Sequence, residues 1–255
     1  MAVAGIDVGA KTVKVVIMRN GDVLSKTLVI TGFDQVESVN QALDEALNIA
    51  SLSRDQLDKI VATGVGGNVV DFAAESIPEV RSAALGAVSL LPNVRTVIDV
   101  GAEEGRATKT SPDGKVVDFV INEKCSAGAG IFVEAMARAI EVQLEEMGPM
   151  SMRSTKAVPM NAQCSVFAES EVVSLIHAGT SKEDISRAIH DAIASRIASM
   201  VRRIGVEKDV ALIGGVAKNV GFEESLKRTL GLSSLLIPED PEFVGALGAA
   251  LAGAN

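Results

Sequence analysis

One pentapeptide, Ile-Asp-Val-Gly-Ala, occurs twice in this chain, at residues 6–10 and again at residues 98–102. Each copy ends a run of β-branched residues, which is typical of a buried strand. Each copy also leads into a predicted hairpin, whose turn is Asn20-Gly21 in the first case and residues 111–114 in the second. A five-residue match alone could arise by chance. A match placed in the same way before two hairpins indicates two related domains.

The rest of the sequence alternates between helical and strand patterns, as in a mixed α/β protein. Helical patterns span residues 34–50, 131–143, 166–177, 182–204, 222–230 and 241–252, and strand patterns span residues 59–63 and 209–213. Thr180-x-x-Glu183 and Ser181-x-x-Asp184 both fit a capping box for the longest of these helices. The length of 255 residues suits one large domain or two small ones, and we place the boundary near residue 93.

Composition argues against some classes of partner. The formal net charge is −9 and only 3% of the residues are aromatic, so the surface repels phosphate backbones and anionic membranes and offers few platforms for stacking bases. No apolar stretch approaches the ~20 residues that span a bilayer. Asp7 interrupts the apolar start where a signal peptide would continue. We therefore expect a cytoplasmic protein without a nucleic-acid or membrane partner. We expect His177 and His190 to be surface or capping residues.

Three glycine turns follow predicted strands and are candidates for binding a nucleotide. The first two carry a strand-end aspartate, Asp7 or Asp99, that could hold Mg²⁺ directly or through water. Glycine lets backbone N–H groups approach phosphate oxygens, and lysine and threonine side chains can add donors. The other candidates are Gly9, Ala10, Lys11, Thr12 and Lys14 in the first turn, Gly101 and Glu103 in the second, and Gly214, Gly215, Val216 and Asn219 in the third.

These turns allow two interpretations. Any one of them alone is better explained as a tight turn, but three together, two of them duplicated with an aspartate, favour a nucleotide site. None is a P-loop, because the sequence lacks Gly-x-x-x-x-Gly-Lys-Ser/Thr. The pattern resembles the phosphate-1, phosphate-2 and adenosine motifs of the actin/sugar-kinase/Hsp70 fold. That resemblance implies two ribonuclease H-like domains, 1–93 and 94–240, closing over ATP, with a last helix at residues 241–253 packed on the first domain.

The two cysteines, Cys125 and Cys164, each directly precede a predicted helix. A helix N-terminus favours a thiolate or an anionic cluster attached to it. Spacing alone favours two buried, inert residues, because there is no Cys-x-x-Cys and two ligands cannot complete a four-cysteine site. A two-fold axis between subunits would supply each cysteine twice and so make four.

Four segments around these features resemble the activator ATPases of 2-hydroxyacyl-CoA dehydratases and benzoyl-CoA reductases. The segments are residues 124–130, 163–171, 214–219 and 245–251, and the similarity spans nearly the whole chain. The resemblance implies a dimer with one 4Fe-4S cluster held by Cys125 and Cys164 of both subunits. It also implies Mg²⁺-dependent ATP hydrolysis, ferredoxin or flavodoxin as electron donor, and an acyl-CoA dehydratase or reductase as electron acceptor.

The second turn departs from this family's pattern. Residues 99–104 read Asp-Val-Gly-Ala-Glu-Glu, where activators usually read Asp-Ile-Gly-Gly-Gln-Asp. Glu103 therefore replaces an amide by a carboxylate, which could repel the γ-phosphate or act as a catalytic base that orients water. The form of this turn is more similar to the smaller ATPase subunit of benzoyl-CoA reductases. A heterodimer with a paralogous subunit is thus an alternative to the homodimer.

Two other functions fit the same fold. A small-molecule kinase would need no cluster, and a nucleotide-gated filament protein would polymerise with ATP. Iron content and sedimentation separate both from the electron-transfer hypothesis.

Overall fold

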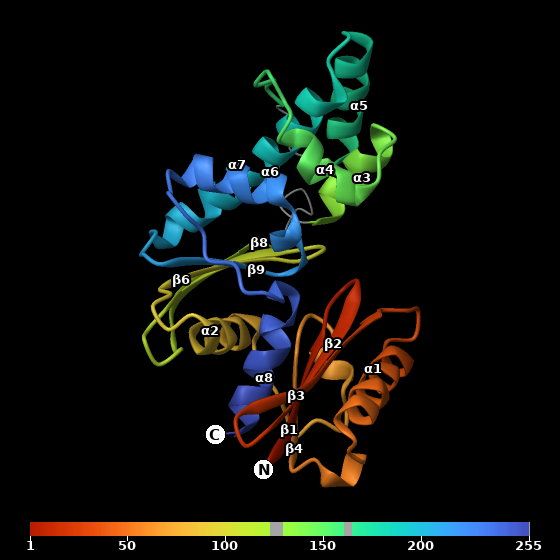
Figure 1. Cartoon of the computed structure of the whole chain (residues 1–255), viewed down its shortest axis with the longest axis vertical. Coiled ribbons are helices and arrows are strands. Elements are labelled where there is room, and N and C mark those ends of the chain that lie inside the picture. The colour runs from red at the N-terminus through yellow and green to blue at the C-terminus, as the bar shows by residue number, and fades with distance from the viewer. Residues whose placement is uncertain (123–129, 161–164, 255) are drawn as a thin grey trace. The chain divides into compact units, whose positions relative to one another are not determined.

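The computed structural model describes residues 1–122, 130–160 and 165–254, which form two β-sheets with helices packed on them (Figure 1). The chain divides into two compact units. Unit 1 comprises Met1–Val97, Thr108–Phe119 and Pro238–Asn255, and unit 2 comprises Ile98–Ala107 and Val120–Ile237. Among the described residues, none of the helices combines the length and apolar character that crossing a bilayer requires.

The first sheet has five strands in the order β3-β2-β1-β4-β5. They are β1 (Ala2–Val8), β2 (Thr12–Arg19), β3 (Asp22–Ile30), β4 (Lys59–Thr63) and β5 (Glu75–Ser76). β1, β2 and β3 pair antiparallel, whereas β4 lies parallel to both β1 and β5. Asn20 and Gly21 join β2 to β3 with φ angles of 54° and 97°, the left-handed values that a tight two-residue hairpin turn requires.

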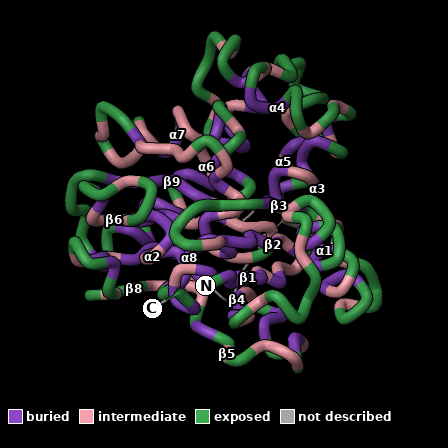
Figure 2. Tube along the Cα trace, turned by 60° about the horizontal axis from the view of Figure 1, so that its bottom comes forward, coloured by how far each residue is buried: buried purple, intermediate pink, exposed green. Residues whose placement is uncertain are grey.

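Helices cover both faces of this sheet. The helix α1 (Gln35–Ala50) shares a core with Val13, Val15 and Ile17 of β2, and α8 (Val244–Ala254) packs on the alternate residues Val16 and Met18. Successive side chains of a strand point to opposite faces of the sheet. Because helices cover both faces of β2, these residues are all buried (Figure 2). The helix α2 (Glu79–Leu90) packs in turn against α8.

α8 comes so close to β1 and α2 that glycine is required at several contact points. A Cβ atom added to Gly5 of β1 would lie 2.0 Å from the Ala246 carbonyl oxygen. A Cβ atom added to Gly248 of α8 would lie 1.8 Å from the Ser82 carbonyl oxygen. The backbones of β1 and α2 therefore both approach the backbone of α8 closely.

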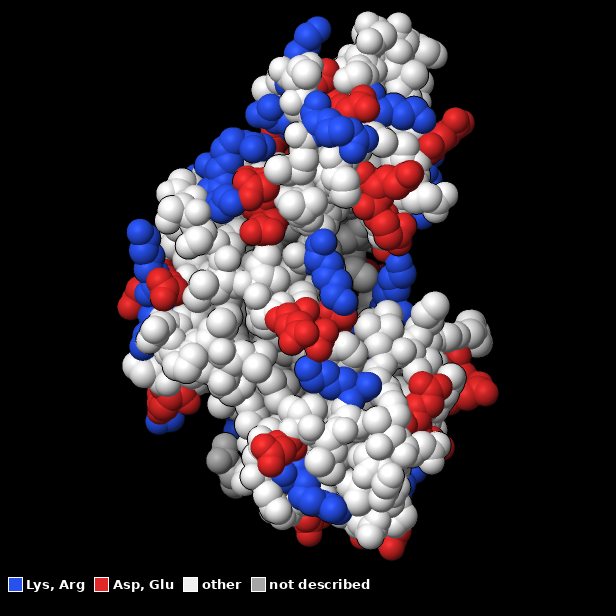
Figure 3. Space-filling view, in the orientation of Figure 1, with Lys and Arg blue, Asp and Glu red and all other residues white. Residues whose placement is uncertain are grey.

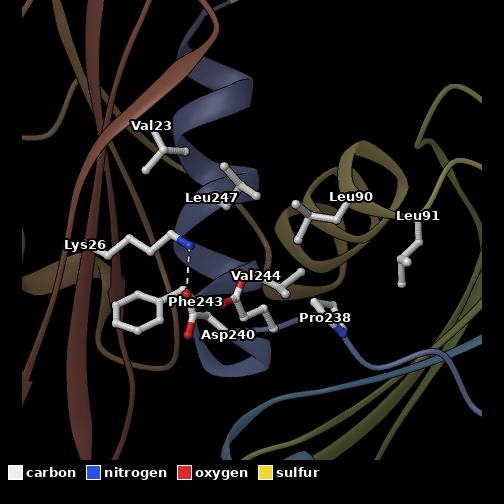
Figure 4. Close-up of a pocket in the computed structure, with 10 residues that line it drawn as sticks. Val23, Lys26, Leu90, Leu91, Pro238, Asp240, Phe243, Val244 and Leu247 are labelled. Carbon is white, nitrogen blue, oxygen red and sulfur yellow. Dashed lines mark hydrogen bonds and ion pairs between the residues drawn. The ribbon is translucent and has the colours of Figure 1, made fainter.

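A cavity of about 230 Å³ lies between β3, the end of α2 and the first turns of α8 (Figure 4). Its walls include Val23, Leu90 and Leu247, and an ion pair of 2.9 Å joins Lys26 on β3 to Asp240. None of the predicted nucleotide-binding residues lines this cavity. It is therefore a packing gap beside α8 and not the predicted site.

The second sheet has four strands in the order β8-β7-β6-β9, which repeats the order β3-β2-β1-β4 of the first. They are β6 (Thr96–Val100), β7 (Gly105–Thr110), β8 (Val116–Asn122) and β9 (Val210–Ile213). The turn between β7 and β8 is closed by a hydrogen bond from the Gly114 amide to the Ser111 carbonyl oxygen. In both sheets the strand that ends in the repeated pentapeptide lies between a hairpin strand and a strand from later in the chain. The duplication inferred from the pentapeptide is thus present in the topology.

Among the described residues of unit 2 there are five α-helices. They are α3 (Gly130–Ala139), α4 (Leu144–Ser151), α5 (Ser165–His177), α6 (Lys182–Ile204) and α7 (Val220–Leu230). Short 3₁₀ helices span Arg54–Gln56, Gly67–Val69, Gly215–Lys218 and Pro241–Phe243. Ser181 caps α6, since its hydroxyl oxygen accepts a hydrogen bond from the Asp184 amide. The predicted helix at 131–143 ends earlier, at Ala139, and neither α2 nor α4 is predicted by the sequence patterns.

His190 lies in the core of unit 2, so the expectation of a surface or capping histidine is wrong. Its exposed fraction is 0%, and a Cβ atom added to Gly221 of α7 would lie 2.9 Å from its ring. Neither ring nitrogen has a hydrogen-bond partner among the described residues. Burial lowers the pKa of His190 to about 4, against opposing contributions from the Ser186 backbone and the Asp191 carboxylate.

We expect this histidine to make the protein less stable in mild acid. The imidazole titrates near its ordinary value of 6.5 when unfolded and about 4 when folded, so the unfolded state takes up the proton first as the pH falls. The free energy of unfolding should drop by about 2 kcal/mol between pH 7 and pH 5 from this group alone. Urea unfolding at both pH values measures it. His190→Met should flatten the pH dependence, and His177→Gln, which removes the exposed histidine, should not. An unchanged pH dependence in His190→Met would contradict the assignment.

Candidate functional site

Asp7 lies near the end of β1, directly across from Lys14 on β2. Its Oδ2 atom is 3.2 Å from the Lys14 Nζ atom, and the two side chains are 16% and 14% exposed. Gly64 follows β4 with a φ of 91°, and a Cβ atom there would lie 2.5 Å from Asp7 Oδ1. A Cβ atom at Gly245 of α8 would lie 3.3 Å from Asp7 Oδ2. The carboxylate is thus enclosed by glycine backbone and one ammonium group.

The turn after β1 holds the other predicted residues of the first half. The Gly9 amide donates a 3.0 Å hydrogen bond to the Thr12 carbonyl oxygen, which closes the turn. A Cβ atom at Gly9 would lie 2.9 Å from Lys14 Nζ, so the ammonium group rests against bare backbone. Lys11 is exposed, and Ala10 and Thr12 are half-buried. The arrangement offers an anion a cationic group beside accessible backbone.

Asp99 repeats this geometry at the end of β6. The Gly101 amide donates a 2.9 Å hydrogen bond to the Glu104 carbonyl oxygen, closing a turn of the same length as the first. Gly214 follows β9 with a φ of 85°, and a Cβ atom there would lie 2.6 Å from Asp99 Oδ1. The cation of this half is Arg106, whose guanidinium contacts Asp99 Oδ2 at 3.5 Å.

The third turn is anchored at both ends and open in the middle. Gly214 packs against the end of β6, whereas a Cβ atom at Gly215 would meet nothing within 4 Å. Val216 is buried and packs against Gly130 at the start of α3. Asn219 caps α7, because its Oδ1 atom accepts hydrogen bonds from the two amides at positions 221 and 222. The exposed Gly215 is therefore the part of this turn that a ligand could approach.

The structure distributes the predicted residues over the two units. Asp7, Gly9, Ala10, Lys11, Thr12 and Lys14 belong to unit 1, and Asp99, Gly101, Glu103, Gly214, Gly215, Val216 and Asn219 belong to unit 2. Glu103 is exposed in the turn between β6 and β7. Its neighbour Glu104 is half-buried and forms an ion pair with Arg106.

Sequence reasoning missed three residues that complete these arrangements. Gly64 follows β4 as Gly214 follows β9, and Arg106 stands seven residues after Asp99 as Lys14 does after Asp7. Both signals were available once the duplication was known. Gly245 had no such signal, because its position beside Asp7 depends on how α8 packs on the first sheet.

Cys125 and Cys164 lie outside the described residues. The helices that follow them are described: α3 begins at Gly130, α5 begins at Ser165, and these two helices pack against each other. Both cysteine segments therefore lead into one helix pair. Within residues 1–122, 130–160 and 165–254, no group of three or more His, Cys, Asp or Glu side chains could hold a metal ion by itself.

The charged side chains of the described residues are intermixed over the face shown in Figure 3 and form no broad basic area there. With a formal net charge of −9 the chain has no general positive field, so an anion would be bound by local geometry, such as the backbone and ammonium group around Gly9 and Lys14.

Residues 4–253 of this chain match the sequence model of the BadF/BadG/BcrA/BcrD ATPase family. The 2-hydroxyisocaproyl-CoA dehydratase activator of Clostridioides difficile is 36% identical over 251 residues, which cover 98% of this chain and 94% of the relative. A benzoyl-CoA reductase subunit of Thauera aromatica is 30% identical over 262 residues, covering 98% of this chain and 92% of the relative.

Solved structures are similar over the whole chain. Component A of (R)-2-hydroxyglutaryl-CoA dehydratase from Acidaminococcus fermentans superposes with a TM-score of 0.95 at 35% identity and covers 99% of this chain and 97% of that one. A sugar kinase, the ROK hexokinase of Thermus thermophilus, has a TM-score of 0.54 at 16% identity and shares the fold alone. The predicted actin/sugar-kinase-like α/β fold is confirmed.

Proposed function

This chain belongs to the BadF/BadG/BcrA/BcrD ATPase family, and from that membership we propose that it uses ATP hydrolysis to deliver single electrons to an acyl-CoA dehydratase or a benzoyl-CoA reductase-type enzyme. The observation that carries the ATPase part is the duplicated arrangement around Asp7 and Asp99. Each carboxylate lies at the end of a strand, next to a glycine whose φ angle is in the left-handed region, and contacts a cationic side chain from the neighbouring strand.

This geometry suits ATP bound with Mg²⁺. Mg²⁺ is usually held by one or two carboxylates together with water and substrate phosphates, so Asp7 and Asp99 need no further protein ligands. In our proposal Lys14 neutralises phosphate charge beside the Gly9 backbone, and the exposed backbone at Gly215 borders the adenosine. Gly101 supports the second carboxylate turn. Glu103 either orients the attacking water or slows hydrolysis by repelling the γ-phosphate. The rate of ATP hydrolysis by a Glu103→Gln variant distinguishes the two.

We further propose that Cys125 and Cys164 of two subunits hold one 4Fe-4S cluster, which supplies one-electron chemistry when it is bound. The support is that both cysteine segments lead into the packed pair α3 and α5. The relatives named as activators support an acyl-CoA dehydratase or reductase as partner. Ferredoxin or flavodoxin is the proposed donor. We favour the homodimer over a heterodimer with a paralogue, because this chain has both cysteines.

The domain division also belongs to this proposal. Residues 1–93 and 94–240 would be the two related domains, because each contains one copy of the pentapeptide strand and its hairpin. Residues 241–253 would belong with the first domain, since α8 packs on β1 and β4.

Loss of either cysteine should abolish the cluster. Anaerobically purified protein is expected to be a brown dimer with about four irons, as a four-cysteine cluster requires. Cys125→Ser or Cys164→Ser removes two of four ligands at once, so the iron and sulfide content should fall to background. Sedimentation of the same variants measures whether the dimer remains. Wild-type iron content in either variant would contradict the assignment.

ATP-dependent reduction of a partner enzyme tests the whole function. Anaerobic protein with a low-potential electron donor should reduce an acyl-CoA dehydratase component only when MgATP is present. Phosphate transfer from ATP to a small acceptor, by colourless protein, would favour the kinase alternative. Polymer that sediments with ATP would favour a filament protein. Full activity of the chain alone would exclude the heterodimer.

A further inference from the structure

Arg106 occupies the position in the second half of the site that Lys14 occupies in the first, but its contacts differ. Its NH1 atom lies 3.5 Å from Asp99 Oδ2, and its NH2 atom lies 2.6 Å from Glu104 Oε2. Lys14 pairs with the carboxylate of Asp7. The guanidinium thus bridges two carboxylates of the turn after β6. In the turn after β1, the ion pair of Lys14 involves the one carboxylate of Asp7.

Burial separates the two cations as well. The Arg106 side chain is 6% exposed, less than the 14% of Lys14, although its carboxylate partners Asp99 and Glu104 are 19% and 27% exposed. A guanidinium stays charged at all relevant pH values, and its planar donors fix the direction of each bond. A buried guanidinium between two more exposed carboxylates is suited to hold them in place. An ammonium on a flexible stem is better suited to follow a ligand.

Asp99 and Glu104 would repel one another without this cation, because both are acidic and both contact the same guanidinium. The turn fixes the backbone of Glu104 near the end of β6 independently, since the Gly101 amide donates a hydrogen bond to the Glu104 carbonyl oxygen. Arg106 is therefore the group that offsets the repulsion created by the turn itself.

We propose that Arg106 is a positioning residue for ATP hydrolysis, which holds the Asp99 and Glu104 carboxylates in place around the turn after β6. The inference rests on the proposed ATPase function and deepens it. It assigns different tasks to the duplicated cations: Lys14 contacts the nucleotide, and Arg106 orients carboxylates without touching it.

The test compares Arg106→Gln, Arg106→Lys and Glu104→Gln with the wild-type chain in steady-state ATP hydrolysis. Misplacement of a group at the reacting centre can cost about 100-fold in rate, so Arg106→Gln should lower kcat by about 10- to 100-fold and change KM for ATP by less than about 3-fold. Arg106→Lys should recover part of the rate, because an ammonium group on the equivalent strand does reach its carboxylate, as Lys14 shows at 3.2 Å. Lys115→Gln removes a cation paired with Asp113 on the β7–β8 hairpin and is the matched control.

Coupling between the two partners gives a second measurement. In the Glu104→Gln background Arg106→Gln should cost clearly less than in the wild type, because one of the two carboxylates is already neutral. Two results would overturn the inference and leave the ATPase proposal standing. One is that the losses of kcat in the two single variants simply add in the double variant. The other is that Arg106→Gln and Lys115→Gln have the same kcat per folded molecule. Absence of ATP hydrolysis by the wild-type chain would contradict the proposed function and this inference with it.

Discussion

Replacement of Asp7 by asparagine is expected to lower ATP hydrolysis by about 100-fold or more, the usual effect of removing one preorganised electrostatic group from an active site. The amide side chain would keep the shape of the carboxylate but could no longer offer a negative charge to Mg²⁺. The enclosure by Gly64 and Gly245 leaves no room for another acidic side chain to take its place. The measurement is kcat with saturating MgATP.

The fold should survive this change. Asp7 gives up its ion pair with Lys14, whose side chains are 16% and 14% exposed, so the loss should lie between the about 1 kcal/mol of an exposed pair and the about 3 kcal/mol of a buried one. Each 1 kcal/mol lost corresponds to a fall of the melting temperature by about 2–4 °C for a chain of this size. Asp22→Asn, an identical change at an exposed position on β3, is the control and should leave both quantities unchanged. Hydrolysis by Asp7→Asn at the wild-type rate would show that Asp7 is only a strand-end residue.

Replacement of Gly248 by alanine is expected to have the largest effect on stability. The new methyl group would lie 1.8 Å from the Ser82 carbonyl oxygen, and both atoms belong to rigid helices, so α8 or α2 must move. Overpacking of this kind costs about 3 kcal/mol or more, which lowers the melting temperature by about 10 °C. ATP hydrolysis should fall as well, because Gly245 lies one turn earlier on α8, where a Cβ atom would come within 3.3 Å of Asp7 Oδ2. Thermal unfolding followed by circular dichroism measures the first effect.

Gly215→Ala provides the comparison for stability, since its Cβ atom would meet nothing within 4 Å. Its melting temperature should stay within about 2 °C of the wild type, because the glycine is not needed for packing. Equal melting temperatures for Gly248→Ala and Gly215→Ala would refute the close approach of α8 to α2.

The parts of the fold that depend on local chemistry could be predicted from the sequence. Asn20-Gly21 specifies its hairpin, β4 begins and ends at the predicted residues Lys59 and Thr63, and the capped helix α6 spans the predicted Lys182–Ile204. These elements are encoded by turn residues, periodicity and caps within a few positions. The family resemblance rested on equally local segments and is confirmed by the match over residues 4–253.

The features that were missed depend on contacts between distant segments. His190 is buried because α7 presents a glycine to it, and helical periodicity does not reveal what a neighbouring helix carries. Gly245 reaches Asp7 only through the packing of α8 on the first sheet. Arg106 could have been found by applying the seven-residue interval of Asp7 and Lys14 to the second copy. The roles of the predicted site residues stay predictions until they are measured.

The close packing of α8 on β1 has a consequence for biosynthesis. Residues 9–243 lie between β1 and the helix that covers Gly5, Val16 and Met18, so the strand is translated well before the helix that packs on it. At ordinary rates of elongation this delay lasts roughly ten to fifty seconds. During that time Val16 and Met18 lack the helix that buries them in the folded protein. Unit 1 combines segments that are far apart in the sequence, so it cannot be completed until α8 has been made.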